Sequence, residues 1–106
     1  MIKHKYGEFT NAQFSDFLDT VHDWVHWVLI YAEQSHEATL PYIRTTQLKL
    51  AGLNDLLEQD KHLLEIMTLV ESAKIEYERA GCKTPHLRKM ILDAHDEIDL
   101  LRPHVR

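Results

Sequence analysis

The chain has 106 residues, 44% of them hydrophobic and 27% charged, and its formal net charge at pH 7 is −5. A chain of this length forms one domain with a small core, and its composition is too hydrophobic for a disordered segment. The negative charge argues against binding to a nucleic-acid backbone or to an anionic membrane surface, because both need a basic protein surface. A basic protein partner is compatible with this charge.

The cysteine content and the start of the chain bear on its location. The single cysteine, Cys82, excludes an intramolecular disulfide framework. The first residues are not followed by an apolar segment and a cleavage site, so no signal peptide is recognisable. The apolar run at residues 24–32 is far too short for a transmembrane helix, which needs about 20 residues to span a bilayer. We therefore expect a cytoplasmic protein.

The first predicted elements are a non-helical arm and a long helix. Residues 1–9 show no helical period, and we expect them to form a tail or a docking arm. Thr10 or Asn11 can cap a helix that begins directly afterwards. Apolar residues then recur at steps of three and four, which predicts a helix over residues 12–38.

A second, shorter helix is expected over residues 41–52. Pro41 disfavours helical geometry at the preceding residue and suits the first turn of a new helix. A glycine and an asparagine interrupt the weak apolar pattern, so we expect a break near residues 52–54. A continuous helix over residues 41–80 would be about 60 Å long at roughly 1.5 Å per residue, which is too long for a compact chain of this size.

Two further helices complete the predicted fold. An apolar stripe predicts a helix over residues 55–80, and Asp55 with Glu58 fits an N-cap with a returning carboxylate. The threonine–proline pair at residues 84–85 is a strong start signal for a last helix over residues 85–102. No segment shows the alternation typical of strands. We therefore predict a single all-α domain, a small antiparallel helical bundle with three long helices and one short helix.

Residues 24–32 are apolar on almost every face of the first predicted helix. A helix at the surface of a small domain normally shows one apolar stripe, so this segment lies at the centre of the fold or contacts a partner. Aspartates nearby would give such a contact a polar rim, and tryptophan is enriched at binding hot spots. The expected partner-binding residues are Asp19, Asp23, Trp24, Trp27, Ile30 and Tyr31. The alternative is that Trp27 and Ile30 pack beneath the short helix over residues 41–52.

Histidines and glutamates form a second candidate site, which would bind a metal ion. On the first helix Glu33 and His36 have the Glu-x-x-His spacing of di-metal carboxylate bundles, whereas His62 and Glu65 on the third helix are in the reverse order. The candidate ligands are His22, His26, Glu33, His36, His62 and Glu65, with His95 as a further member. A carboxylate-rich shell suits iron or manganese, and a histidine-rich shell suits zinc. The alternative is that these histidines lie on helix flanks with their polar tips in water.

The number of histidines raises a third possibility. The chain has eight of them, and their protonation near pH 6.5 would move the net charge from −5 towards neutral or positive values. His22 and His26 would repel each other when charged, so a third hypothesis is a pH-responsive assembly in which they lie near an interface.

Catalytic signatures are weak. Cys82 with His86 could bind a metal or activate a thiol, but no second cysteine accompanies them. His95 beside Asp96 and Glu97 could take part in acid–base chemistry, but we find neither a nucleophile nor a phosphate-binding loop.

The sequence therefore predicts a small non-enzymatic helical protein that acts by protein–protein binding, of adaptor or inhibitor type. We also expect it to self-associate into a homo-oligomer, with no nucleic-acid or membrane partner. In size and class it is similar to bacteriocin immunity proteins and to many phage-encoded inhibitors and adaptors, without a motif in common. The alternative is a metal-binding helical bundle that uses the histidine and glutamate set, with redox or hydrolytic activity.

Overall fold

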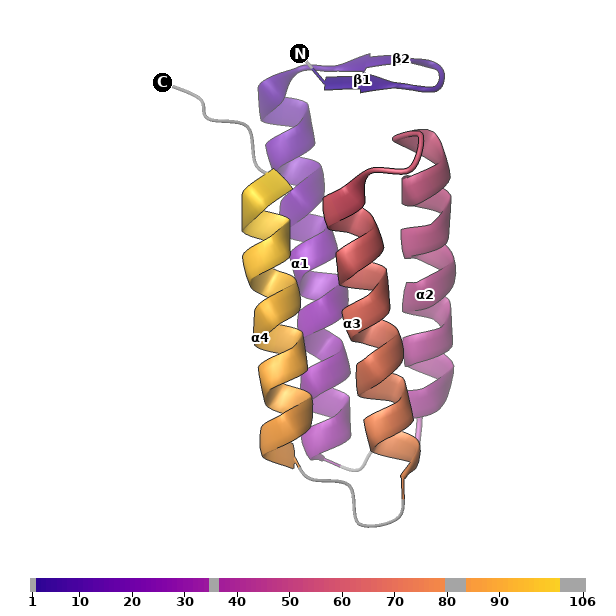
Figure 1. Ribbon diagram of the computed structural model, residues 1–106, viewed down its shortest axis with the longest axis vertical. Coiled ribbons are helices and arrows are strands. Elements are labelled where there is room, and N and C mark those ends of the chain that lie inside the picture. The colour runs from indigo at the N-terminus through magenta and orange to yellow at the C-terminus, as the bar shows by residue number, and fades with distance from the viewer. Residues whose placement is uncertain (1, 35–36, 80–83, 102–106) are drawn as a thin grey trace.

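The computed structural model describes residues 2–34, 37–79 and 84–101, which form a four-helix bundle with a β-hairpin at one end (Figure 1). The hairpin consists of β1 (Ile2–His4) and β2 (Gly7–Phe9). The helices are α1 (Asn11–Glu33), α2 (Thr39–Leu56), α3 (Lys61–Glu78) and α4 (Thr84–Leu101). The predicted all-α bundle is therefore confirmed, with a small hairpin added to it.

The helices run alternately up and down, so each is antiparallel to its neighbours (Figure 1). α4 packs against α1 and α3, α3 also packs against α2, and α1 and α2 close the ring. The α3–α4 pair has the most extensive contact of these neighbouring pairs, and the α1–α2 pair has the least extensive. The α1–α2 seam can therefore hold large side chains.

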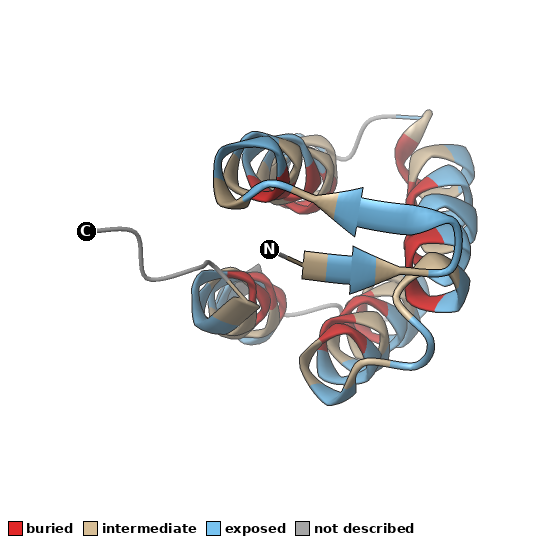
Figure 2. Ribbon diagram, turned by 90° about the horizontal axis from the view of Figure 1, so that it is seen from above, coloured by how far each residue is buried: buried red, intermediate tan, exposed pale blue. Residues whose placement is uncertain are grey.

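Each helix turns one apolar stripe towards the centre of the bundle, where the buried residues gather (Figure 2). α1 supplies the largest share: Phe14, Leu18, Val21, Val25, Val28 and Leu29. This spacing places them on one side of the helix. Burying one such aliphatic or aromatic side chain contributes about 1.5–3 kcal/mol, so these stripes hold the bundle together. No helix in the described part of the chain is both long and apolar enough to cross a membrane.

The start of α1 agrees with the sequence prediction. Thr10 is the N-cap, and its hydroxyl oxygen accepts a hydrogen bond from the backbone N–H of Gln13 at 3.0 Å. The side-chain oxygen of Gln13 accepts in return from the backbone N–H of Thr10 at 2.9 Å. This reciprocal capping box satisfies backbone donors that the helix itself leaves without acceptors.

The second helix is longer than predicted. α2 covers Thr39–Leu56, so it continues through residues 52–54, where the sequence predicts a break. Gly52 is an exposed helical residue in open space. A glycine costs a helix about 1 kcal/mol relative to alanine, which is less than the gain from burying Leu50 and Leu53 in the core.

The predicted N-cap of the third helix is wrong. Asp55 lies in the last turn of α2 and forms an ion pair with Lys5 at 3.4 Å. Asp60 is the N-cap of α3, and its carboxylate accepts hydrogen bonds from two backbone N–H groups of the first turn at 2.8 and 3.2 Å. The chain reverses at Glu58 and Gln59, whose φ angles are 58° and 71°. Since neither residue is a glycine, the sequence carries no turn signal at this point.

Residues 1–9, predicted to be a tail or a docking arm, form the hairpin as far as the structure describes them. β1 and β2 pair antiparallel, with Ile2 opposite Phe9. The hairpin lies across one end of the bundle (Figure 2), and the backbone N–H of Lys5 donates to the carbonyl oxygen of Leu56 at 2.8 Å. Strands of three residues are too short to show an alternating pattern, so the sequence does not reveal them.

Candidate functional site

Aromatic residues line the seam between α1 and α2. Phe17, Trp24 and Tyr31 follow one another at intervals of seven residues, so they share one flank of α1. Phe17 meets Trp24 edge-on with ring centroids 5.9 Å apart, and Tyr31 meets Tyr42 of α2 edge-on at 5.0 Å. The hydroxyl group of Tyr42 donates to the backbone carbonyl oxygen of Trp24 at 2.9 Å. These contacts hold this flank of α1 against α2.

Trp27 lies outside this seam. It is 46% exposed, and its ring system contacts the ring of Tyr31 at a centroid distance of 5.7 Å. Trp24 is partly buried, and the ammonium group of Lys49 lies 4.9 Å from its ring centroid. Side chains of α2 therefore contact Trp24 and Tyr31 and leave Trp27 open to solvent. Trp27 is therefore not buried beneath the second helix, whereas Ile30, the other residue of that alternative, is partly buried.

The six residues expected to bind a partner share one stretch of α1, which we call the aromatic face: Asp19, Asp23, Trp24, Trp27, Ile30 and Tyr31. Asp19 is exposed, and the side chain of Asp23 is 76% exposed. Ile30 and Tyr31 are partly buried. Trp27 is thus the most exposed apolar member of a surface that also carries carboxylates.

Other large apolar side chains are exposed on other elements: Tyr6, Leu48, Leu64, Ile75, Leu92 and Leu100. Scattered exposed leucines and isoleucines are ordinary on a protein surface. Trp27 differs from them because it adjoins a row of partly buried aromatic side chains. The aromatic face is therefore a better candidate for a binding surface than these scattered positions.

The structure does not bring the predicted metal ligands into one group. Glu33 accepts two hydrogen bonds from the guanidinium group of Arg88, at 2.9 and 2.7 Å. His62 on α3 contacts Glu97 of α4, with 2.9 Å between Nδ1 and Oε2. His36 lies outside the described residues. The antiparallel register of α4 causes this separation, because it places a charged partner opposite Glu33 and another opposite His62.

Glu65 lies among carboxylates rather than histidines. It lines a groove whose other charged members are Asp93, Asp96 and Glu97. Among the residues that the structure describes, no group of three or more histidine, cysteine, aspartate or glutamate side chains is arranged to hold a metal ion. The geometry therefore assigns none of these side chains as a metal ligand.

Three imidazole rings meet between α1 and α4, and we call His22, His26 and His95 the histidine cluster. The rings of His22 and His95 stack with centroids 3.9 Å apart, and His26 lies 5.5 Å from His95. Nδ1 of His26 and Nε2 of His95 are buried, without a hydrogen-bond partner among the described residues. Burial, and then the charges of His22 and His26, lowers the pKa of His95 to about 4 against the opposing effect of Asp99 and Asp96.

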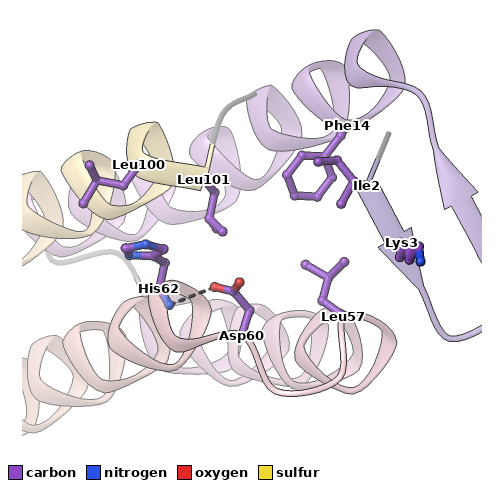
Figure 3. Close-up of a pocket in the computed structure, with 8 residues that line it drawn as sticks. All are labelled: Ile2, Lys3, Phe14, Leu57, Asp60, His62, Leu100 and Leu101. Carbon is purple, nitrogen blue, oxygen red and sulfur yellow. Dashed lines mark hydrogen bonds between the residues drawn. The ribbon is translucent and has the colours of Figure 1, made fainter. Parts of the chain in front are cut away.

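A cavity of about 280 Å³ opens beneath the hairpin, beside the start of α3 and the end of α4 (Figure 3). Its lining is mostly apolar: Ile2, Lys3, Phe14, Leu57, Asp60, His62, Leu100 and Leu101. The carboxylate of Asp60 caps α3, and the imidazole of His62 contacts Glu97. Asp60 and His62 therefore already bind other groups of the protein. These contacts do not favour a role for either residue in acid–base catalysis in the cavity.

The other catalytic candidates from the sequence are not assembled into a site. Cys82 lies outside the described residues. Nδ1 of His86 is 3.9 Å from the carboxylate of Glu76, which is buried and also contacts Arg79. His95 belongs to the histidine cluster, where its neighbours are two other imidazoles rather than a nucleophile.

Two features of the described residues are therefore candidates for a function. The aromatic face exposes Trp27 at the surface, and the histidine cluster places three imidazoles between α1 and α4. No family model, curated protein or solved structure matches this chain. Its function has therefore to be inferred from the chemistry of its own residues.

Proposed function

We propose that this protein acts by binding another protein chain through the aromatic face, as a binding protein of adaptor or inhibitor type, and that the face binds a second copy of the same chain. The observation that carries this proposal is the exposure of Trp27, at 46%, beside an ordered row of aromatic side chains. Covering apolar surface contributes about 25 cal/mol per Å². Tryptophan is accordingly among the residues that dominate the binding energy of interfaces.

The surroundings of Trp27 favour binding at a low entropic cost. Trp27 packs against Tyr31, and the ring of Tyr31 lies against Tyr42. Tyr42 is hydrogen-bonded in turn to the backbone of Trp24. A side chain that is already ordered loses less freedom when a partner covers it. Trp27 therefore loses less entropy on association than a tryptophan without such neighbours.

The charges around the aromatic face support a second copy as the partner. The side chain of Asp23 on α1 is exposed, and Lys49 on α2 lies 4.9 Å from the ring centroid of Trp24. In a dimer with two-fold symmetry the same patch meets itself, so each charge can face the opposite charge of the other chain. We expect Asp23 of one copy to face Lys49 of the other. A partner with a purely basic rim would attract the aspartates but repel Lys49.

Metal binding has no comparable support. Glu33 and His62, which the metal hypothesis needs, are each paired with a residue of α4. We therefore propose binding rather than redox or hydrolytic catalysis. A cytoplasmic location fits this proposal, since a chain with a single thiol needs no oxidising compartment.

Sedimentation velocity at increasing protein concentration tests self-association. We expect the wild-type chain to dimerise at micromolar concentrations. Trp27→Ala should weaken dimerisation by about 2 kcal/mol, or roughly 30-fold in Kd. Leu64→Ala removes an exposed apolar side chain from α3, a helix that carries neither the aromatic face nor Lys49, and should leave the dimer unchanged. A wild-type chain that stays monomeric, or a Trp27→Ala variant that associates as the wild type does, would contradict the proposal.

A charge exchange tests how the two copies meet. Asp23→Lys and Lys49→Glu each place like charges across the proposed interface, so each variant alone should associate more weakly than the wild type. When the two variants are mixed, both contacts again join opposite charges, and association should recover. If mixing restores nothing, Asp23 and Lys49 do not face each other across a two-fold axis.

A further inference from the structure

The histidine cluster lies on the flank of α1 that faces α4, away from the seam with α2, although Asp23 of the aromatic face lies 3.9 Å from Nδ1 of His22. His22 and His26 are one helical turn apart, and His95 stacks on His22 with centroids 3.9 Å apart. Along α4, His95 directly follows the buried Ala94, and Ile98 is buried one turn further on. Titratable rings thus lie beside buried apolar residues in a contact that also holds the ion pair of Glu33 with Arg88.

The stacked arrangement favours neutral imidazoles. Two imidazolium ions with ring centroids 3.9 Å apart, as in the stack of His22 and His95, would repel each other strongly where water is partly excluded. An imidazolium ion also donates from both ring nitrogens, whereas a neutral imidazole donates from one. The buried nitrogens, Nδ1 of His26 and Nε2 of His95, have no acceptor among the described residues. Protonation of the cluster therefore adds both repulsion and donors without acceptors.

The carboxylates on α4 itself do not compensate for this penalty. Asp96 and Asp99 are close enough to His95 to favour its protonated form. Burial and the two neighbouring imidazoles outweigh them, so the pKa of His95 remains lowered, at about 4. Neutral His95 is therefore the form that this packing stabilises.

Charged groups on the other helices lie mostly outside the stack. On α1, Asp23 is 3.9 Å from Nδ1 of His22, but its side chain is 76% exposed and its field is screened by solvent and salt. The charged groups that α3 turns towards this part of α4 include Glu65 and His62. Glu65 lines the acidic groove of α4, and His62 pairs with Glu97. Neither of them is placed to neutralise a charge inside the histidine cluster.

We propose that the histidine cluster is an acid-sensitive latch between α1 and α4. While the imidazoles of the cluster are uncharged, their stack closes the seam. As the pH falls below about 6.5, where free histidine takes up a proton, charging of the cluster forces the rings apart and opens the seam around His22 and His95. α4 stays attached to α3, with which it has its most extensive contact.

Titration of the imidazole protons by nuclear magnetic resonance tests this latch directly. Each histidine of the wild-type chain is followed from about pH 8 down to about pH 3, which includes the pKa of His95 at about 4. We expect the cluster to take up protons in separate steps, with at least one of its rings still neutral at about pH 5. Three independent titration curves, all with midpoints near 6.5, would overturn the proposal.

Backbone hydrogen exchange tests whether the seam opens. Corrected for the intrinsic exchange rate, protection of the amides around His22 and His95 should fall at least about tenfold between pH 7 and about pH 4, where His95 takes up its proton, while protection in α2 stays constant. His95→Phe keeps an aromatic ring in the stack without a charge, and should abolish this loss. His86→Gln removes an exposed histidine of α4 outside the cluster and should behave as the wild type does. Equal losses of amide protection in the wild type and in His95→Phe would overturn the latch. If His95→Phe does not fold, the titration of the wild-type histidines decides alone.

Discussion

The hydroxyl group of Tyr42 on α2 donates a hydrogen bond to the backbone carbonyl oxygen of Trp24 on α1, with 2.9 Å between the two oxygens. This bond joins the pair of neighbouring helices that have the least extensive contact. The ring centroids of Tyr42 and Tyr31 are 5.0 Å apart. One side chain of α2 therefore positions two residues of the aromatic face.

Tyr42→Phe should lower the free energy of unfolding by about 0.5–1.5 kcal/mol, because it removes the hydrogen bond between the helices and keeps the ring. Urea denaturation followed by circular dichroism measures the change. Tyr6→Phe removes a hydroxyl group from an exposed residue of the hairpin turn and should change stability by less than about 0.5 kcal/mol. If the two substitutions have the same effect, the Tyr42 hydroxyl group contributes nothing specific.

His95 leads us to expect that acid weakens the fold. Its pKa is lowered in the folded chain from 6.5 to about 4, first by burial and then by His22 and His26. The unfolded chain therefore binds the proton first, so this stabilisation is fully present above about pH 6.5 and is lost as the pH falls towards about 4. Urea midpoints should decline more steeply between pH 7.5 and pH 5 for the wild type than for His95→Phe. Parallel declines would contradict this expectation.

Asp60→Ala should destabilise the chain by about 1 kcal/mol, because two backbone N–H groups at the start of α3 lose their acceptor. Asp55→Ala removes only an exposed ion pair with Lys5, and such pairs are worth about 0–1 kcal/mol. Thermal unfolding of the two variants compares these positions. A larger loss from Asp55→Ala would mean that α3 begins where the sequence alone predicts it.

The helices and their buried faces could be predicted because they depend on local patterns. Apolar steps of three and four residues place Leu18, Val21 and Val25 in the core of the bundle. Thr10, one of the two predicted caps, is the N-cap of α1, and α4 begins at Thr84, where the threonine–proline pair indicates a start. Each of these signals lies within a few residues of the feature that it predicts.

The connection between α2 and α3 could not be predicted, because it depends on contacts formed only in the folded chain. The side-chain amide of Asn54 donates to the side-chain oxygen of Gln59 at 3.0 Å, and the backbone N–H of Gln59 donates to the carbonyl oxygen of Asn54 at 2.9 Å. These bonds support a left-handed backbone at Glu58 and Gln59 without a glycine. The sequence therefore favours an earlier break at residues 52–54.

The candidate sites could be predicted only as far as they lie on one helix. The helical period places Trp27 and Asp23 on the same side of α1. The approach of Lys49 to Trp24, and the stacking of His95 on His22, depend on which helices become neighbours and in what register. The separation of the predicted metal ligands has the same cause, since Arg88 and Glu97 reach their partners from α4.

Coverage of Trp27 by a second copy is tested most directly by the fluorescence of that indole alone. Trp24→Phe leaves Trp27 as the single tryptophan of the chain and keeps an aromatic ring in the α1–α2 seam. As the concentration of this variant is raised from low micromolar to several hundred micromolar, we predict a shift of the emission maximum to shorter wavelength and weaker quenching by acrylamide, because the indole leaves water. Emission and quenching that stay at their dilute values across this range would contradict the proposal that a second copy covers the aromatic face.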